Sequence, residues 1–442
     1  MRILYVTAGY PPESLGGVEL HIAGLARAAA AAGDEPLVLA RSGRPGLPHL
    51  GVLDETIEGV PVTRLGNTFE DATTFERLYD HPGLADAVGE QVRRLAPDVV
   101  HIHHLTCLSV GVIDRCRALG VPVVMTLHDF WMGCPRGQRI TAGLDLCPEI
   151  KLGKCLPCLR ELWPHVLGRG RAPDAPAEER DAGDMALLEA YHGRIHQVLG
   201  LVDQLITPSA FMQRMYAAYG VEAARIRVVE NGLPRARWAA ALAAAPRRVR
   251  GDGGRLRVGF IGSVLPSKGA HLAVAAVKRL GDPLGIALEV WGEVLPFHHD
   301  RGYGQRLQQQ MAGFESAITL KGPYANEDLP GILAGLDVVV VPSIWYEAYG
   351  LTIREAFLAG VPVVTADHGA MAEAVRDGET GLLFRAGDSA SLADALRRLA
   401  DSPELRRRLA GSPDWVRDET ETAAELREVY DRAVRSTRGE PG

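Results

Sequence analysis

The stretch from Val338 to Thr365, VVVVPSIWYEAYGLTIREAFLAGVPVVT, constrains the fold more than any other part of the chain. Four consecutive valines predict a strand covered on both faces, and Gly360 with Pro362 ends the following helix before a second apolar strand. This order of strand, helix and strand predicts a parallel βαβ unit. Ligands of such sheets bind beyond the carboxyl ends of the strands, so the loop over residues 342–349 should face a binding site.

The helix that follows this loop is suited to binding phosphate. Gly350, Leu351 and Thr352 place free backbone N–H groups at the positive end of the helix dipole. Glu347 precedes that end and Glu355 lies inside the helix, where a carboxylate would repel the same phosphate. We therefore expect Glu355 to accept hydrogen bonds from neutral hydroxyls such as a vicinal diol. The simpler alternative is that both glutamates are solvated helix charges.

The string EAYGLTIRE, in which seven residues separate two glutamates, resembles the E-x7-E signature of retaining, nucleotide-sugar-dependent glycosyltransferases of family four. The flanking strings PSIWY and AFLAGVPVV fit the same pattern, and the resemblance extends from Met1 to about Asp401. It implies the GT-B fold: two doubly wound, Rossmann-like α/β domains facing a cleft, with a C-terminal helix that crosses back to the first domain. It also implies that Glu355 binds the ribose diol of the donor and that Glu347 binds the sugar hydroxyls.

Length and composition describe a globular protein of two domains. The net charge of −7 argues against a general nucleic-acid binder, and there is no apolar run of about 18 residues that could span a membrane. The N-terminal string MRILYVTAGYPP shows no signal-peptide pattern, so we expect a cytoplasmic protein. The expected divisions are an acceptor-side domain over 1–234, a linker over 235–254, a nucleotide-sugar-binding domain over 255–413, and a C-terminal helix and tail over 414–442.

The first predicted strand, residues 2–7, is followed by a loop rich in glycine and proline and by a helix to about Ala32, the first βα turn of a doubly wound domain. Gly16 and Gly17 in this loop allow the backbone to approach a ligand closely; an ordinary turn is the alternative. The string PPESLGGVE resembles the N-terminal glycine loop of the family. That resemblance implies that both glycines contact the donor.

Two further predicted strands, in DVVHIH and VPVVMTL, are each followed by or end in histidine, which gives His103, His104 and His128. A histidine at the carboxyl end of a strand faces the cleft, with a capping or packing role as the alternative. The string TLHDFW resembles the family segment whose histidine contacts the donor sugar. This resemblance implies that role for His128, and His103 is the second candidate.

The predicted turn FIGSVLPSKG of the second domain places Lys268 just before a helix, where a cation can meet a diphosphate. A solvated lysine is the alternative. The turn resembles the family's GR-x4-KG motif, whose Arg and Lys clamp the diphosphate; Lys268 matches the lysine, but Ser263 takes the place of the arginine. Serine is too short for a bidentate ion pair, so we expect the diphosphate to depend on Lys268 and the helix at Leu351, or on Lys321 or Arg354.

Two segments are hard to interpret from sequence. Residues 66–83 have no clear period, and in this fold such insertions often line the acceptor site, so the acceptor itself is not predicted. Residues 159–185 are polar and contain proline together with Arg160, Trp163 and His165. This mixture suits peripheral contact with the inner face of an anionic membrane, but a mobile solvated loop is favoured.

Our first hypothesis is a glycosyltransferase of the hexosyltransferase type (EC 2.4), acting in glycan, glycolipid or glycosylated-metabolite biosynthesis. Its partners would be a nucleoside diphosphate sugar, usually of uridine or guanosine in this family, and an acceptor hydroxyl. Lys268, Glu347 and His128 are the catalytic candidates, and no general base is expected, because in the retaining family the departing phosphate oxygen takes the acceptor's proton. Since the sequence has no Asp-x-Asp triplet, we expect catalysis without a divalent metal or other cofactor.

Two alternatives remain open for the function. One is a GT-B protein that has lost catalysis and acts as a partner or scaffold, which Ser263 supports. The other is a nucleotide-sugar epimerase of the same fold. The intact set of Glu347, Glu355 and Lys268 counts against both.

Four of the six cysteines lie within 25 positions of one another: Cys134, Cys147, Cys155 and Cys158. The last two form a C-x-x-C pair, which can place two thiolates on one metal ion. Clustering disfavours free thiols, and the expected cytoplasmic location disfavours two disulfides. A structural zinc site with four cysteine ligands fits best, and an iron–sulfur cluster is the alternative. Because the cluster begins six residues after His128, we expect it to shape the loop beside the donor sugar.

Overall fold

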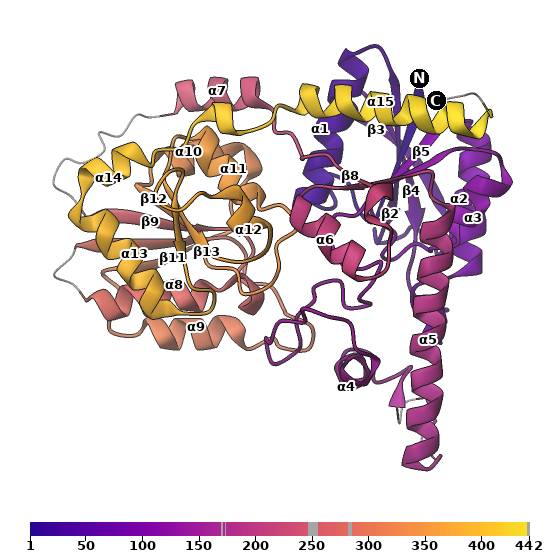
Figure 1. Ribbon diagram of the computed structural model, residues 1–442, viewed down its shortest axis with the longest axis horizontal. Coiled ribbons are helices and arrows are strands. Elements are labelled where there is room, and N and C mark those ends of the chain that lie inside the picture. Colours follow the sequence, from indigo (N-terminus) through magenta and orange to yellow (C-terminus); the bar gives the residue numbers. More distant parts are fainter. Residues whose placement is uncertain (169–170, 173, 246–254, 282–284, 440–442) are drawn as a thin grey trace. The chain divides into compact units, whose positions relative to one another are not determined.

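A computed structural model describes residues 1–168, 171–172, 174–245, 255–281 and 285–439. The chain divides into two compact units, each built on its own sheet (Figure 1). Unit one consists of Met1–Gln138, Pro148–Gly232 and Asp418–Gly442. Unit two consists of Arg139–Cys147 and Leu233–Arg417.

Unit one contains an eight-stranded sheet in the order β3-β4-β2-β1-β5-β6-β7-β8. Neighbouring strands are parallel except for β3 and β4, which are antiparallel. The strands are β1 (Arg2–Thr7), β2 (Glu35–Ser42), β3 (Val52–Ile57), β4 (Val60–Gly66), β5 (Val99–Ile102), β6 (Val123–Thr126), β7 (Gln204–Thr207) and β8 (Ile226–Val228). The central strands β1, β5 and β6 are almost wholly buried, as their continuous apolar runs predict.

Helices accompany this sheet, and the last one returns to it from the end of the chain. They are α1 (Gly17–Ala31), α2 (Pro82–Leu95), α3 (Val112–Ala118), α4 (Leu152–Leu162), α5 (Ala177–Leu201), α6 (Ala210–Ala218) and α15 (Glu419–Thr437), with short 3-10 turns η1 (Glu76–Leu78) and η3 (Ala223–Arg225). Helix α15 lies beside α1 (Figure 1), and the Tyr430 hydroxyl is 2.7 Å from His101 Nδ1 on β5. The predicted return of the C-terminal helix to the first domain is confirmed.

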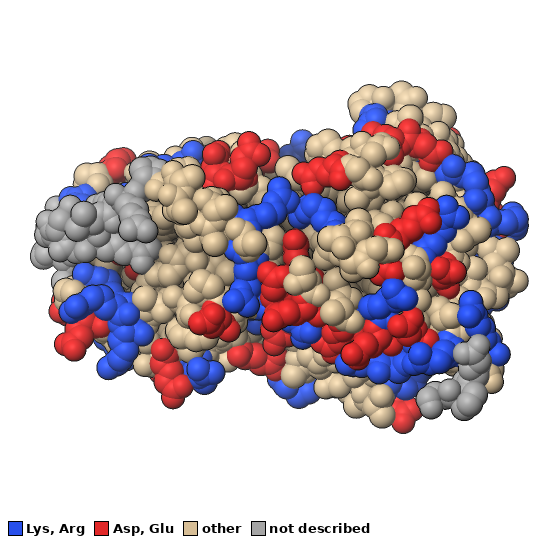
Figure 2. Space-filling model, turned by 90° about the horizontal axis from the view of Figure 1, so that it is seen from above, with Lys and Arg blue, Asp and Glu red and all other residues tan. Residues whose placement is uncertain are grey.

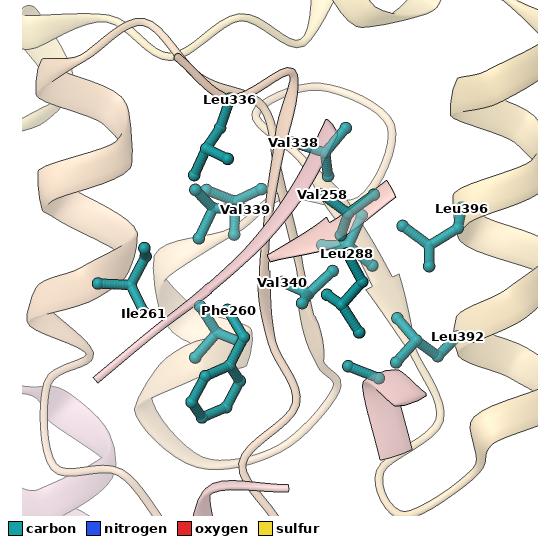
Figure 3. Packing of buried hydrophobic residues seen from close by; sticks show 14 of the residues in the cluster. Val258, Phe260, Ile261, Leu288, Leu336, Val338, Val339, Val340, Leu392 and Leu396 are labelled. Carbon is teal, nitrogen blue, oxygen red and sulfur yellow. The ribbon is translucent and has the colours of Figure 1, made fainter. Parts of the chain in front are cut away.

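Unit two contains a six-stranded parallel sheet in the order β11-β10-β9-β12-β13-β14. The strands are β9 (Leu256–Ile261), β10 (Ile286–Trp291), β11 (Ile318–Gly322), β12 (Val338–Val341), β13 (Val363–Ala366) and β14 (Leu382–Phe384). The four valines of β12 are buried, and Figure 3 shows side chains of β9, β10 and β12 packed together with leucines of α13. The predicted βαβ unit is therefore the centre of this core.

The helices of unit two are α7 (Arg235–Ala244), α8 (Ala270–Leu280), α9 (Tyr303–Met311), α10 (Leu329–Ala334), α11 (Leu351–Leu358), α12 (Gly369–Ala374), α13 (Ser389–Asp401) and α14 (Pro403–Arg408), with 3-10 turns η4 (Pro266–Lys268), η6 (Asn326–Asp328) and η7 (Pro413–Trp415). Helix α7 lies within the stretch that was expected to be the linker, and this helix belongs to unit two. Residues 246–254 of that stretch lie outside the described residues.

The two ends of the segment predicted as a solvated loop, residues 159–185, are helical. Helix α4 continues to Leu162 and α5 begins at Ala177. The reason lies in Asp184, which is fully buried and accepts hydrogen bonds from Arg160 Nε at 2.8 Å and Arg171 Nε at 3.0 Å. These charge-assisted bonds hold polar residues that show no period in the sequence, and the loop prediction was wrong for residues 159–162 and 177–185.

Both sheets have a point at which the strand order reverses, between β1 and β5 in unit one and between β9 and β12 in unit two. Ligands of doubly wound sheets bind beyond the carboxyl ends of the strands at this point. The loops after β1, β5, β9 and β12 carry Gly16, His103, Ser263, Lys268, Glu347 and Gly350. Of the other predicted residues, His128 follows β6, and Leu351, Thr352 and Glu355 lie on α11 (Leu351–Leu358). The topology thus gives each unit its own candidate binding edge.

Within the described ranges, no helix has the length and apolar character needed to cross a membrane. On the face shown in Figure 2, Lys and Arg side chains are interspersed with Asp and Glu side chains.

Candidate functional site

The candidate site of unit two centres on a cluster of hydrogen bonds around Glu347. Lys268 Nζ donates to Glu347 Oε1 at 2.7 Å, Ser343 Oγ donates to the same oxygen at 2.7 Å, and Trp345 Nε1 donates to it at 2.8 Å. Burial works against the charged form, but Lys268 and the two neutral donors hold the pKa of Glu347 below its ordinary value. Glu347 is therefore a carboxylate at neutral pH, and it is bound to the lysine that the sequence also singled out.

A glycine makes this pairing possible. Gly269 has φ +75°, and a Cβ at this position would lie 2.0 Å from the carbonyl oxygen of Pro342. The Ile344 N–H donates to the Ser267 carbonyl at 2.9 Å. The loops that follow β9 and β12 thus touch through their backbones, which brings Lys268 to the loop of Glu347.

Glu355 lies in the second turn of α11, and its environment differs from that of Glu347. Burial alone raises its pKa to about 7. The Glu355 carboxylate also contributes, after burial, to the raised pKa of Tyr324, so the two side chains lie within electrostatic range. A desolvated carboxyl group of this kind is poised to accept hydrogen bonds from neutral hydroxyls.

Helix α11 begins after Gly350, whose φ of +77° is the left-handed conformation that glycine adopts most easily. The N–H groups at this end belong to the predicted phosphate site at Leu351 and Thr352. Arg354, the suggested substitute for the family's arginine, is buried, lies 3.9 Å from the centre of the Tyr349 ring and donates to the Tyr349 carbonyl. The Arg354 guanidinium is thus already engaged by Tyr349, just before the helix begins.

The other suggested substitute, Lys321, lies at the end of β11 with its Nζ 5.4 Å from the centre of the Trp291 ring. Ser263, which replaces the arginine, is half-buried in the loop after β9. Of the two lysines considered for the diphosphate, Lys268 contacts Glu347 directly, whereas Lys321 lies against Trp291.

In unit one, three histidines converge at the carboxyl edge of the sheet. Ring nitrogens of His21, His103 and His128 lie within 4.8 Å of one another, and His103 Nδ1 is 2.8 Å from His128 Nε2. Burial, followed by the neighbouring histidines, lowers the pKa of His103 and of His128 well below the ordinary value, and burial lowers the pKa of His21 to about 4. All three rings are therefore neutral at pH 7. Nε2 of His128 is already engaged in a hydrogen bond with His103.

This arrangement bears on the predicted contact between His128 and the donor sugar. Since Nε2 is bound to His103, a sugar hydroxyl would have to meet another atom of His128, and the role remains a prediction. Three neutral imidazoles could also ligate a metal ion, but the bond between His103 and His128 already uses one proton and one lone pair. His104 turns instead to Asp129, with Nε2 2.9 Å from Oδ2.

The glycine loop of unit one carries an acidic side chain at the start of its helix. Helix α1 begins after Gly16, and a Cβ on Gly16 would lie 2.5 Å from Glu19 Oε2. Ser14 Oγ donates to Glu19 Oε1 at 3.0 Å. A phosphate approaching Gly16 and Gly17 would have to displace this carboxylate, so their predicted role requires Glu19 to move.

A second group of potential ligands in unit one consists of His49, Asp71 and His81. His81 Nδ1 accepts a hydrogen bond from the Leu84 N–H, so the proton of the neutral ring must lie on Nε2. That nitrogen is 2.7 Å from Asp71 Oδ2, to which it donates. The group is thus a paired carboxylate and imidazole rather than a set of free lone pairs for a metal ion.

The predicted zinc ligands fall in both units. Cys134, Cys155 and Cys158 belong to unit one and Cys147 belongs to unit two. Cys155 and Cys158 lie three residues apart on α4, and Arg136 Nη1 donates to Cys158 Sγ at 3.5 Å. The four-cysteine site remains a prediction.

Residues 15–237 match the family described as Glycosyltransferase Family 4, and residues 255–402 match the one described as Glycosyl transferases group 1. The chain belongs to glycosyltransferase family 4. The glycogen synthase of Mycobacterium tuberculosis is 30% identical over 466 aligned residues, covering 99% of this chain and 96% of the relative. A 2-deoxystreptamine glucosyltransferase of Streptomyces kanamyceticus is 26% identical, covering 91% of this glycosyltransferase and 94% of the relative.

Solved structures show the same fold. The Anabaena protein HepE in complex with UDP has a TM-score of 0.67 at 18% identity, covering 98% of this chain and 100% of that chain. Sucrose-phosphate synthase from Thermosynechococcus elongatus has a TM-score of 0.67 at 20% identity, covering 99% and 100%. The predicted GT-B fold and the predicted activity, a nucleotide-sugar-dependent glycosyltransferase, are confirmed.

The sequence identified Lys268 and Glu347 but not the two neutral donors to Glu347. Ser343 and Trp345 lie within the string PSIWYE, so their spacing was visible. What the spacing does not show is that the loop turns both side chains onto one oxygen, because this depends on the backbone path between β12 and α11.

Proposed function

We propose that this glycosyltransferase transfers a sugar from a nucleoside diphosphate sugar to an acceptor hydroxyl with retention of configuration, and that unit two holds the donor. The observation that carries the proposal is the cluster of Lys268, Glu347, Ser343 and Trp345 beside the start of α11. It combines a cation for the diphosphate with an ionised carboxylate for the sugar. Glu355, one and a half turns into α11, supplies the acceptor for the ribose diol.

The chemistry asks little of the side chains. The nucleoside diphosphate is a good leaving group, so the protein has to stabilise its growing negative charge and hold the acceptor nearby. Lys268 and the N–H groups at Leu351 would do the first. The departing phosphate oxygen would take the proton of the acceptor hydroxyl on the same face of the sugar, so neither a dedicated base nor a divalent metal is required.

Uridine diphosphate sugars are the first donors to test. Solved structures of the Anabaena protein HepE, which has a similar fold, are complexes with UDP or UDP-glucose. The relatives are named for different products or acceptors, including glycogen, inositol 3-phosphate and 2-deoxystreptamine, so the acceptor has to be found by screening.

The test is the release of nucleoside diphosphate from a panel of UDP, GDP and ADP sugars, first without and then with an acceptor library. We expect slow release from one donor alone and faster release with the correct acceptor. An epimerase would change the sugar without releasing diphosphate. A scaffold would do neither, and either result would overturn the proposal.

Retention is a separate prediction. The E-x7-E match and the same-face proton transfer predict that the new glycosidic bond has the anomeric configuration of the donor. Proton NMR of the purified product measures the anomeric coupling constant of the new glycosidic bond. An inverted coupling would contradict the proposed mechanism while leaving the glycosyltransferase activity in place.

We also propose that Cys134, Cys147, Cys155 and Cys158 bind one structural zinc ion. Residues three apart on a helix are neighbours, which supports Cys155 and Cys158 as a ligand pair. Elemental analysis of protein purified without oxygen should find about one zinc per chain. Cys158→Ser should lose the metal, whereas Cys107→Ser, which changes a half-buried thiol outside the cluster, should keep it. Metal-free wild type would refute the site, and a brown protein would indicate iron–sulfur instead.

A further inference from the structure

We propose that Trp345 is a positioning residue of the donor site, which holds Lys268 and Glu347 in the arrangement that meets the sugar and the leaving diphosphate. The inference rests on the proposed function and extends it to a residue that would touch neither reacting atom. Trp345 makes two different interactions, one with each partner of the ion pair. Together the three side chains form a closed triangle.

The distances define this triangle. Trp345 Nε1 donates to Glu347 Oε1 at 2.8 Å, and Lys268 Nζ lies 5.0 Å from the centre of the indole ring. Lys268 Nζ and Glu347 Oε1 are 2.7 Å apart. A cation over an indole face is attracted by the ring quadrupole, so Trp345 fixes the lysine by its face and the glutamate by its edge.

The backbone on which Trp345 stands is itself fixed. The preceding residue, Ile344, donates its N–H to the Ser267 carbonyl at 2.9 Å. Ser343 is buried, and its carbonyl oxygen is 2.9 Å from His368 Nε2. The loop is therefore attached both to the turn that contains Lys268 and to the start of α12, so the backbone that carries the indole is held in place.

In this geometry the two carboxylate oxygens of Glu347 have different roles. Oε1 accepts all three of the hydrogen bonds recorded for this carboxylate in the described part of the chain, from Lys268, Ser343 and Trp345. Oε2 is thus the oxygen available to sugar hydroxyls. Lys268 has three N–H donors and uses one on Glu347, so two remain for phosphate oxygens. Trp345 keeps both groups in place before the donor arrives, which is preorganisation of the site.

Two substitutions separate the interactions of Trp345. Trp345→Phe keeps an aromatic face for Lys268 but removes the N–H donor to Glu347, and Trp345→Leu removes both. Trp415→Phe is the matched control, because Trp415 belongs to the same unit, is 40% exposed and packs on Phe357. Thermal unfolding of each variant should be recorded alongside the kinetics.

We expect Trp345→Phe to lower kcat about tenfold and Trp345→Leu about a hundredfold, with KM for the donor changed less than about threefold. The acidic limb of the pH profile of kcat should also move to higher pH in Trp345→Phe, because Glu347 loses a donor that stabilises its charged form. A residue that merely supported the fold would not move this limb. Trp415→Phe should match the wild type in both respects.

Two results would overturn the inference. If Trp345→Phe keeps the wild-type kcat and pH profile, the N–H bond does not position Glu347. If both variants lose activity only in proportion to lost folded protein, the role of Trp345 is structural. These outcomes assume an active wild type; a wild type that consumes no nucleotide sugar in the donor panel refutes the proposed function, and with it this inference.

Discussion

Replacing Lys268 by alanine should lower kcat about 10²- to 10³-fold, the effect typical of removing one preorganised group that stabilises transition-state charge. Negative charge on the leaving diphosphate grows as the glycosidic bond breaks, so the lysine contributes more to the transition state than to donor binding. KM for the donor should therefore change far less than kcat. Steady-state kinetics with the preferred nucleotide sugar measures both.

The Lys268→Ala substitution also removes the cationic partner of Glu347. Control variants must separate this effect from the loss of the lysine at the diphosphate. Glu347 is largely buried, and without Lys268 its charge has lost its cationic partner. The double variant Lys268→Ala with Glu347→Gln removes this charge and should fold like the wild type while remaining inactive. Lys278→Ala removes another lysine of unit two, one that donates to the Gln310 carbonyl, and should keep full activity. Wild-type turnover in Lys268→Ala would show that another cation, such as Lys321, serves the diphosphate.

Glu355→Gln should weaken donor binding about 10- to 100-fold at pH 8, because it replaces charge-assisted hydrogen bonds to the ribose diol by neutral ones. In the donor-free protein, burial raises the pKa of Glu355 to about 7. The carboxylate is the form that accepts both hydroxyl protons, so the affinity of the wild type should rise about tenfold per pH unit below 7 and level off above it. In Glu355→Gln this pH dependence should be absent.

The titration is best followed with the intact nucleotide sugar, whose diphosphate carries no group that ionises near neutral pH. Fluorescence or calorimetric binding curves between pH 5.5 and 8.5 are required for both proteins. The same raised pKa predicts that folding stability decreases as pH rises from the ordinary glutamate range to 7, because the folded state holds this proton longer than the unfolded state. A pH-independent wild-type affinity would contradict the assignment of Glu355 to the diol.

The sequence was most informative where side-chain chemistry repeats along the chain. The valines of β12 were predicted with their observed bounds, because four β-branched residues in a row suit a strand buried on both faces. Strand β3 was missed, since VLDETI has two adjacent acidic residues and no regular alternation of apolar and polar residues, and it forms a partly exposed antiparallel edge. Helix α4 was missed because Gly153 and Pro157 interrupt its pattern.

The candidate site, too, was only partly predictable from the sequence. Lys268 and Glu347 could be proposed from motifs, but their direct contact depends on the close approach of Gly269 to Pro342, which joins segments far apart in the sequence. Arg354 was a reasonable substitute for the arginine that Ser263 replaces, and the structure instead places its guanidinium on Tyr349. Such choices between partners are made by packing, which a linear motif does not encode.

The central claim is that unit two binds the nucleoside diphosphate through Lys268 and Glu355. Isothermal titration calorimetry with UDP and GDP at pH 8 tests it most directly, on the wild type, Lys268→Ala, Glu355→Gln and Lys278→Ala. Free nucleoside diphosphate carries the charge that develops on the leaving group. The contribution of Lys268 to affinity should therefore be larger for the free diphosphate than for the intact donor. We predict that the wild type and Lys278→Ala bind one nucleotide equally and that the other two variants bind it at least tenfold more weakly; equal binding by all four proteins would contradict the account.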